Sequence, residues 1–296
     1  MASSAQHQGI IVGVDGSPPS KVAIDWAARE AALHKVPLTL VHVTSPQAGL
    51  TWVEPMVLVG YSEWQETRGR EVLQEATRLA DEATRDLGGV VTETEMLDGP
   101  VISTLIDLSK GAQMLVVGCR GLGAVGRTLL GSVSSALVHH AHCAVAVIHD
   151  AELPATTPTN APVVLGVDGS QASEKATAIA FDEASRRGVG LVAVHTWNDA
   201  AVLDFPGFDI AQFRQSAHEV LAERLAGWQE RYPDMPVERV VAWDRPAPQL
   251  LLQSERAQLL VVGSHGRGGF AGMLLGSVSS AVVNGAKVPV VVARQS

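Results

Sequence analysis

The chain has 296 residues, of which 46% are hydrophobic and 18% charged, a composition typical of a globular protein long enough for two domains. The formal net charge of -9 disfavours nucleic acid as a partner, because an acidic surface repels a polyanionic backbone. There is no apolar run of the roughly 18 residues that a membrane helix needs, no secretory signal at the N-terminus and no CxxC pair. We therefore expect a cytoplasmic protein that binds neither membranes nor nucleic acid.

Ten short apolar and β-branched runs predict strands. They cover, in the first half, residues 9–15, 37–44, 90–96, 113–118 and 144–149, and in the second half 162–168, 189–196, 236–242, 258–263 and 288–293. Helical spacing of apolar residues marks segments 20–35, 63–87, 132–142, 173–187 and 277–285. The strand runs are nearly all apolar rather than alternating, which predicts burial on both faces of a parallel sheet. Such alternation of strands and helices predicts an α/β fold with a doubly wound sheet.

The two halves of the chain are copies of each other. Residues 10–43 match residues 163–196, residues 115–136 match residues 260–281, and the octet LLGSVSSA is identical in both copies. The first copy has about eight extra residues between these blocks, and we place them in a loop over residues 49–60. The segment 151–162 is rich in Pro and Thr, as linkers are. We expect two tandem domains, residues 1–154 and 155–296.

Each copy carries a glycine loop after its fourth strand. It reads Gly118-x2-Gly121-x9-Gly131-Ser132 in the first copy and Gly263-x2-Gly266-x9-Gly276-Ser277 in the second. Glycine lets backbone amides approach an anion closely, and the Gly-Ser pair opens a helix whose first amides are unpaired. The repeated spacing predicts phosphate binding, to which the hydroxyls of Ser132, Ser134, Ser277 and Ser279 can add bonds. The alternative is that the glycines only turn the chain and that Ser132 and Ser277 are ordinary N-caps.

A second loop follows the first strand of each copy, and it begins with Asp15-Gly16-Ser17 or Asp168-Gly169-Ser170. If the first and fourth strands are neighbours, this loop and the glycine loop face each other across one crevice at the carboxyl ends of the strands. Asp15 and Asp168 could then contact ribose or a phosphate-bound Mg²⁺. The alternative reading is a local cap on the following turn, and one side chain can do both.

The chain resembles the universal stress protein family, and within it the tandem-domain branch that binds ATP. The likeness rests on the GVDGS turn, the G-x2-G-x9-G-S loop and the segments HAHCAVAVIHD and AKVPVVVAR. It implies two flavodoxin-like (Rossmann-like) domains, each an open five-stranded parallel sheet of order 3-2-1-4-5 with helices on both faces. It also implies ATP as the ligand, with Mg²⁺ held mainly by the phosphates.

The resemblance further implies which residues bind the nucleotide. The glycine loop would hold the phosphates and ribose, the end of the first strand would lie along the adenosine, and the residues after the second strand would close over adenine or ribose. In the first copy the set is Gly13, Val14, Asp15, Val43, Gly118, Cys119, Arg120, Gly121, Leu122, Gly123, Ala124, Gly131, Ser132, Val133 and Ser134. In the second copy it is Gly166, Val167, Asp168, Asp199, Gly263, Ser264, His265, Gly266, Arg267, Gly268, Gly269, Gly276, Ser277, Val278 and Ser279.

The two loops differ in sequence at two positions of one three-residue stretch. The second loop has Arg267, Gly268 and Gly269, which offer charge and close backbone approach, whereas the first loop has Leu122, Gly123 and Ala124. We therefore expect the second site to bind ATP more tightly.

Other candidate residues favour structural roles. A metal cluster of His139, His140, His142 and Cys143 is disfavoured, because adjacent residues on a helix point in different directions. Cys119 could be redox-sensitive, but a passive loop cysteine is the favoured reading. Likewise His42 and His195, at matching ends of the second strand, are best explained as structural histidines.

Neither crevice shows a repeated nucleophile–base pair, and Asp15 and Asp168 are the repeated carboxylates. We therefore expect an ATP-binding stress or growth regulator or sensor rather than an enzyme, with two ATP per chain and at most slow hydrolysis. The alternatives are a slow ATPase or adenylating enzyme, and a nucleotide-free interaction scaffold. The apolar fifth strands, residues 144–149 and 288–293, predict that the two copies pack through these edges and that chains form a homodimer. The sequence does not identify a downstream protein partner.

Overall fold

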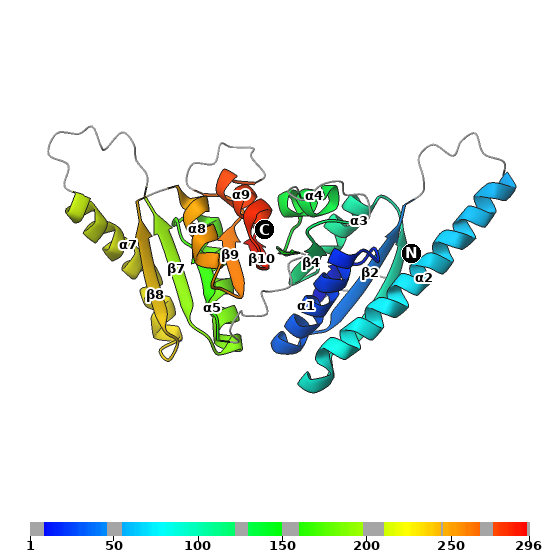
Figure 1. Cartoon of the computed structure of the whole chain (residues 1–296), viewed down its shortest axis with the longest axis horizontal. Coiled ribbons are helices and arrows are strands. Elements are labelled where there is room, and N and C mark those ends of the chain that lie inside the picture. The colour runs from blue at the N-terminus through cyan, green and yellow to red at the C-terminus, as the bar shows by residue number, and fades with distance from the viewer. Residues whose placement is uncertain are drawn as a thin grey trace. The chain divides into compact units, whose positions relative to one another are not determined.

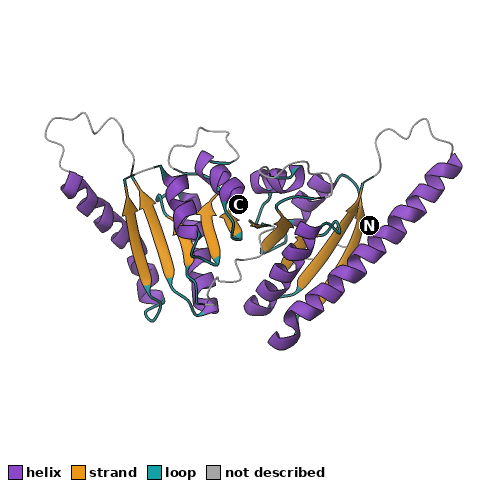
Figure 2. Ribbon diagram, viewed as in Figure 1, coloured by secondary structure: helices purple, strands orange, loops and turns teal. Residues whose placement is uncertain are grey.

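The computed structural model describes residues 9–45, 55–121, 130–149, 160–197, 210–243, 245–266 and 275–294. The chain divides into two compact units, one extending to Asp150 and the other from Ala151 to Gln295. The expected boundary between residues 154 and 155 lies outside the described residues. Each unit has one parallel sheet and its own helices (Figures 1 and 2).

The first unit contains a parallel sheet of order β3-β2-β1-β4-β5. Its strands are β1 (Ile10–Gly13), β2 (Leu38–Thr44), β3 (Thr92–Asp98), β4 (Met114–Gly118) and β5 (Ala144–Ile148). Its helices are α1 (Pro18–His34), α2 (Pro55–Thr84), which a 3-10 turn η2 (Arg85–Leu87) follows, α3 (Val101–Leu108) and α4 (Ser132–His140).

The second unit repeats this arrangement with the order β10-β9-β6-β7-β8. Its strands are β6 (Val163–Gly166), β7 (Leu191–Thr196), β8 (Val237–Ala242), β9 (Leu259–Gly263) and β10 (Val290–Ala293). Its helices are α5 (Gln171–Arg187), α7 (Ile210–Arg231), α8 (Pro246–Ser254) and α9 (Ser277–Gly285). Numbered within its own copy, each sheet has the order 3-2-1-4-5, which confirms the predicted fold.

Helices cover both faces of the sheet. In the first unit Gly69 of α2 lies over His42, whereas Leu105 of α3 lies over Gly13. The register partner of Gly13 is Val41, and successive residues of a strand point to opposite faces. The two helices therefore lie on opposite faces of the sheet, as a doubly wound fold requires.

The strands at the centre of each sheet form the core, and those at the β3 and β8 ends do not match the predicted pattern. Ile10 to Val12 of β1 are at most 2% exposed. By contrast, β3 has the sequence TETEMLD and no fully buried residue, and β8 is likewise part exposed. The expectation of nearly apolar strands is therefore wrong for these two. A strand at the end of a sheet has one open edge, and its two faces need not both be buried.

Helix positions also differ from the prediction in places. Helix α2 begins at Pro55, so the loop expected over residues 49–60 is wrong for residues 55–60. Gly60 suggested a loop, but a glycine costs only about 1 kcal/mol inside a helix. The sequence pattern does not single out α3 and α8, which have eight and nine residues, because short apolar runs do not distinguish helix from strand. None of the helices in the described segments is both long and apolar enough to cross a membrane.

Candidate functional site

In each unit the two predicted loops lie together at the carboxyl ends of neighbouring strands. Strand β1 pairs with β4, and β6 pairs with β9. A Cβ added at Gly121 would lie 2.6 Å from Asp15 Oδ2, and one added at Gly266 would lie 2.5 Å from Asp168 Oδ2. The carboxylate after the first strand therefore lies directly against the glycine loop in both copies, and only glycine leaves room for it.

A local hydrogen-bond network holds this carboxylate. Asp15 Oδ1 accepts a hydrogen bond of 2.9 Å from the Ser17 N–H, and Asp168 Oδ1 accepts an equal bond from the Ser170 N–H. The N–H groups of Asp15 and Asp168 donate in turn to hydroxyls in the first turns of α1 and α5. The capping role that the sequence left open is thus correct for one carboxylate oxygen. The other oxygen faces the glycine loop.

A backbone hydrogen bond closes the base of each glycine loop. The Gly131 N–H donates to the Cys119 carbonyl at 2.8 Å, and the Gly276 N–H donates to the Ser264 carbonyl at 2.7 Å. The chain therefore returns to where it left the strand. The middle of each loop lies outside the described residues, as do these predicted ligands: Leu122, Gly123, Ala124, Asp199, Arg267, Gly268 and Gly269.

The helices that follow the loops begin without a side-chain cap. The N-caps of α4 and α9 are Gly131 and Gly276, and neither helix has a side-chain hydrogen bond at its cap. The reading of Ser132 and Ser277 as N-caps is therefore wrong, because each lies one residue inside its helix. In the same units Ser17 and Ser170 do cap α1 and α5. The first-turn amides of α4 and α9 thus lack the acceptor that the other two helices have, which suits an anion.

Two of the predicted phosphate-binding hydroxyls are engaged elsewhere. Ser134 is 3% exposed and its Oγ donates to the Cys119 carbonyl at 2.9 Å. Ser279 is 4% exposed and its Oγ donates to the Gly263 carbonyl at 2.5 Å. In this structure each hydroxyl proton is thus engaged by a backbone carbonyl, and a bond from these serines to phosphate stays a prediction. Both hydroxyls hold the helix against the base of the loop.

The glycine that opens each loop has a packing role. A Cβ at Gly118 would lie 2.8 Å from the carbonyl carbon of Pro19, and one at Gly263 would lie 2.8 Å from that of Ala172. Both contacts are to backbone in the first turn of a helix. Glycine at these positions therefore lets the strand end approach the helix. A Cβ added at Gly131 would lie 3.3 Å from Arg120 Cα.

The histidines near the ends of the second strands have structural hydrogen bonds, as predicted. His42 Nδ1 and the Val14 carbonyl are 2.7 Å apart, and His195 Nδ1 and the Val167 carbonyl are separated by the same distance. These bonds tie the second strand to the turn that carries the carboxylate. Cys119 is 6% exposed, which agrees with the passive reading of that thiol.

The remaining predicted ligands occupy the same edge of each unit. Gly13 and Gly166 end β1 and β6, and Val43 lies part-buried near the end of β2. In the second unit the His265 carbonyl accepts a bond of 3.0 Å from Ser170 Oγ, which links the two loops directly. Val133 and Val278 are part-buried in the first turns of their helices.

The histidines near the end of α4 do not form a metal-ligand cluster among the described residues. His139 Nδ1 lies 2.6 Å from the Ser135 carbonyl, one helical turn earlier. The Cys143 thiol donates to the Ala144 carbonyl at 3.3 Å. The His139 and Cys143 side chains thus bond to the local backbone.

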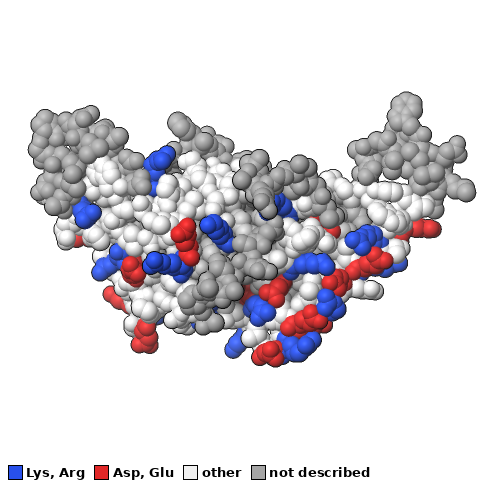
Figure 3. Space-filling model, in the orientation of Figure 1, with Lys and Arg blue, Asp and Glu red and all other residues white. Residues whose placement is uncertain are grey.

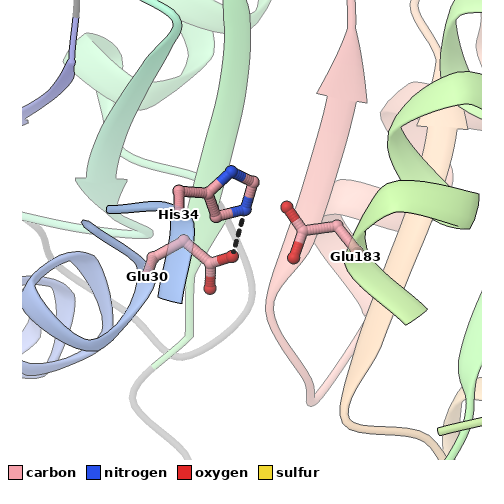
Figure 4. Close-up of side chains that lie close together, drawn as sticks. All are labelled: Glu30, His34 and Glu183. Atoms are coloured by element: carbon pink, nitrogen blue, oxygen red, sulfur yellow. Dashed lines mark hydrogen bonds and ion pairs between the residues drawn. The ribbon is translucent and has the colours of Figure 1, made fainter. Parts of the chain in front are cut away.

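Each unit also buries a glutamate in its first helix, a feature that the motif analysis did not assign. Glu30 is 1% exposed and pairs with His34 at 3.1 Å (Figure 4). Glu183, also 1% exposed, pairs with Arg187 at 3.1 Å. A buried carboxylate needs such a partner. These pairs lie about 20 Å along the helix from its start at the carboxyl edge and are not part of the candidate site.

Comparison with known proteins agrees with this arrangement. The model of the universal stress protein family matches residues 7–149 and 159–294. A universal stress protein of Mycobacterium tuberculosis strain H37Rv is 52% identical over 296 residues, which is 100% of this chain and 99% of that protein. One from Mycolicibacterium smegmatis is 49% identical, with 99% of each chain covered. The crystal structure of a universal stress protein from Archaeoglobus fulgidus has a TM-score of 0.72 at 20% identity and covers 98% of this chain and 100% of that one. The chain therefore belongs to the universal stress protein family, with two copies of the family domain in tandem.

Proposed function

We propose that each copy binds ATP at the carboxyl edge of its sheet and that the chain acts as a nucleotide-dependent regulator or sensor. One observation carries the proposal. A closed glycine loop, an uncapped helix N-terminus and a fixed carboxylate occur together, and they do so twice with the same contacts.

The uncapped helices supply the phosphate end of the proposed site. A helix N-terminus stabilises an anionic charge by about 0.3–1 kcal/mol, so useful affinity requires several amides acting together. The closed loop base brings the start of the loop and the first turn of the helix to one place. The amides of both segments can then converge on a polyphosphate.

The carboxylate favours a nucleotide over free phosphate. Asp15 Oδ2 and Asp168 Oδ2 lie against the glycine loop, where a bare phosphate oxygen would be repelled. A ribose hydroxyl can donate a hydrogen bond to such an oxygen, and a Mg²⁺ ion bridging the phosphates would also suit it. The resemblance to the ATP-binding branch of the family supports adenine as the base.

The same geometry argues for binding rather than rapid catalysis. Among the described residues beside the loops, Asp15 and Asp168 are the carboxylates that the two copies share, whereas the shared histidines, His42 and His195, bond to backbone carbonyls. One oxygen of each already accepts a backbone hydrogen bond, which supports the role of an acceptor rather than of a general base. We infer a turnover well below the ~1 s⁻¹ at which typical enzymes begin.

Calorimetric titration of nucleotide-stripped protein with ATP tests the proposal, and we expect two sites per chain. The variants Gly121→Glu and Gly266→Glu add bulk and negative charge at one loop each, so each should retain one site. Absence of ATP binding in the parent would overturn the proposal in favour of a scaffold. Steady-state ATP hydrolysis or adenylate transfer above ~1 s⁻¹ would instead identify an enzyme.

A further inference from the structure

The turn that carries Asp168 is covered by a charged side chain, whereas the equivalent turn of the first copy is covered by an apolar one. Gly16 and Gly169 follow the two carboxylates, with φ angles of 81° and 76°. A Cβ added at Gly169 would overlap the guanidinium of Arg224 in α7, whereas one added at Gly16 would lie 3.1 Å from Val72 Cγ2 in α2. Arg224 therefore takes the place of Val72 in the second copy.

The planar guanidinium of Arg224 lies with its flat face on this turn. Its central carbon, Cζ, is nearer to a Cβ added at Gly169 than either terminal nitrogen is, which is the geometry of a face rather than of an edge. Arg224 Nη1 also lies 3.4 Å from Glu174 Oε1 in the first turn of α5. The Glu174 N–H donates in turn to the Ser170 carbonyl at 3.0 Å. One side chain thus contacts both the turn and the start of the helix that follows it.

The helix behind Arg224 holds this side chain in place. Leu221 and Leu225 flank it in α7 and are fully buried. The Arg224 side chain itself is only 29% exposed, and within the described part of the chain its buried Nε has no hydrogen-bond acceptor. A buried donor without a partner is unfavourable, so its presence calls for an explanation. Contact with the turn that carries Asp168 is one.

We infer that Arg224 is a positioning residue for Asp168 and keeps the turn of the second site in the arrangement in which the carboxylate faces the glycine loop. The inference rests on the proposed function, in which Asp168 accepts a hydrogen bond from ribose. Val72 covers the first turn, but its side chain has neither a flat polar face nor a charge to pair with the following helix. The two copies therefore fix the same carboxylate by different means.

The test uses the full chain carrying Gly121→Glu, so that only the second site reports. Calorimetry measures its affinity for ATP and for inorganic tripolyphosphate, which has no ribose. Arg224→Val installs the residue of the first copy. We expect it to weaken ATP binding about fivefold to tenfold and to leave tripolyphosphate binding within about twofold. As a matched control, Arg231→Val removes the same charge from the exposed end of α7 and should leave both affinities unchanged.

A double-mutant cycle tests whether Arg224 acts through the carboxylate. Asp168→Asn keeps one oxygen for the Ser170 N–H and removes the second acceptor oxygen, so it should weaken ATP binding by itself. Adding Arg224→Val to it should then cause no further loss. Unchanged ATP affinity in Arg224→Val, an equal loss for tripolyphosphate, or the same loss in the Asp168→Asn background would overturn the positioning role alone. If the Gly121→Glu parent binds no ATP, the proposed second nucleotide site itself fails.

Discussion

Two glycines of the same loop are needed for different physical reasons. Gly118 lies against the backbone of α1, so a side chain there would meet atoms that cannot move away. Gly121 lies against Asp15 Oδ2, at the end of a side chain rather than against backbone. The first glycine therefore serves packing and the second leaves room for a functional carboxylate.

We predict that Gly118→Ala affects mainly stability and that Gly121→Ala affects mainly ATP binding. Gly118→Ala should lower the free energy of unfolding by about 1–3 kcal/mol, because overpacking against backbone forces strain. Gly121→Ala should leave the fold nearly unchanged but displace Asp15 and weaken ATP binding at the first site. Urea denaturation and calorimetric titration measure the two quantities. A parent-like stability for Gly118→Ala would contradict the packing role.

A second residue-scale prediction concerns the ends of α1 and α5. Lys35 ends α1 with φ 56° and ψ 44°, and the equivalent residue after α5 is Gly188 with φ 64° and ψ 34°. This left-handed conformation is unfavourable for a residue with a Cβ and natural for glycine. Lys35→Gly should therefore raise the free energy of unfolding by about 0.5–1 kcal/mol, measured by chemical denaturation. The reverse change, Gly188→Lys, should lower it, and the idea fails if both shift stability in the same direction.

At the scale of elements, the helices that open near the site fall into two kinds. Ser17 Oγ accepts from the Ser20 N–H at 3.3 Å and caps α1, whereas α4 begins at Gly131 without a side-chain cap. We predict that Ser17→Ala lowers the free energy of unfolding by about 1 kcal/mol. Ser132→Ala, in the first turn of α4, is exposed and should change it by less than about 0.5 kcal/mol. Equal losses in denaturation experiments would show that Ser132 is a cap after all.

In each unit an ion pair joins the first two described helices, and the positions of the acidic and basic side chains are exchanged between the two units. Lys21 of α1 pairs with Glu75 of α2 at 3.3 Å, while Glu174 of α5 pairs with Arg224 of α7 at 3.4 Å. Acidic and basic side chains alternate along the exposed face of α2 (Figure 3). Hydrogen bonding from Arg78, and then from Lys21, lowers the pKa of Glu75 from 4.5 to about 2.

This lowered pKa predicts a pH-dependent contribution to stability. A carboxylate whose folded-state pKa is depressed stabilises the fold above its unfolded pKa and loses that effect as pH falls through the folded value. Glu75→Gln should thus lower the melting temperature slightly at pH 7, because the pair is exposed. The difference from the parent should shrink between pH 4.5 and about 2 in thermal melts. A difference that grows toward low pH would contradict the assignment.

At the scale of the whole molecule, the repeat predicts that each unit responds to its own ligand. ATP at a hundredfold excess over its dissociation constant should stabilise a binding unit by about 2.7 kcal/mol. Gly121→Glu should remove this gain for the first unit only, and Gly266→Glu for the second only. Differential scanning calorimetry with and without ATP measures the gain. Loss of both gains in either single variant would contradict independent sites.

The homodimer through the fifth strands stays a prediction.

The sequence by itself determined the parts of the structure that depend on local pattern. Apolar and β-branched runs located the strands, although β3 and β8 are less apolar than expected, and the repeat located two copies, because both are properties of neighbouring residues. The glycine spacing located the edge of the sheet where the candidate site lies, since a turn that approaches an anion needs glycine wherever it occurs. The family resemblance supplied the strand order, which the structure confirms.

Only the tertiary structure decided what each of those residues touches. Three contacts depend on which strands are neighbours. Gly118 lies against Pro19, the Ser134 hydroxyl donates to the Cys119 carbonyl, and Asp15 lies against Gly121. The pairing of Thr44 with Asp98 depends on register between strands that a long helix separates in the sequence. A shift of one residue in that register would turn each side chain to the opposite face, and no local pattern encodes it.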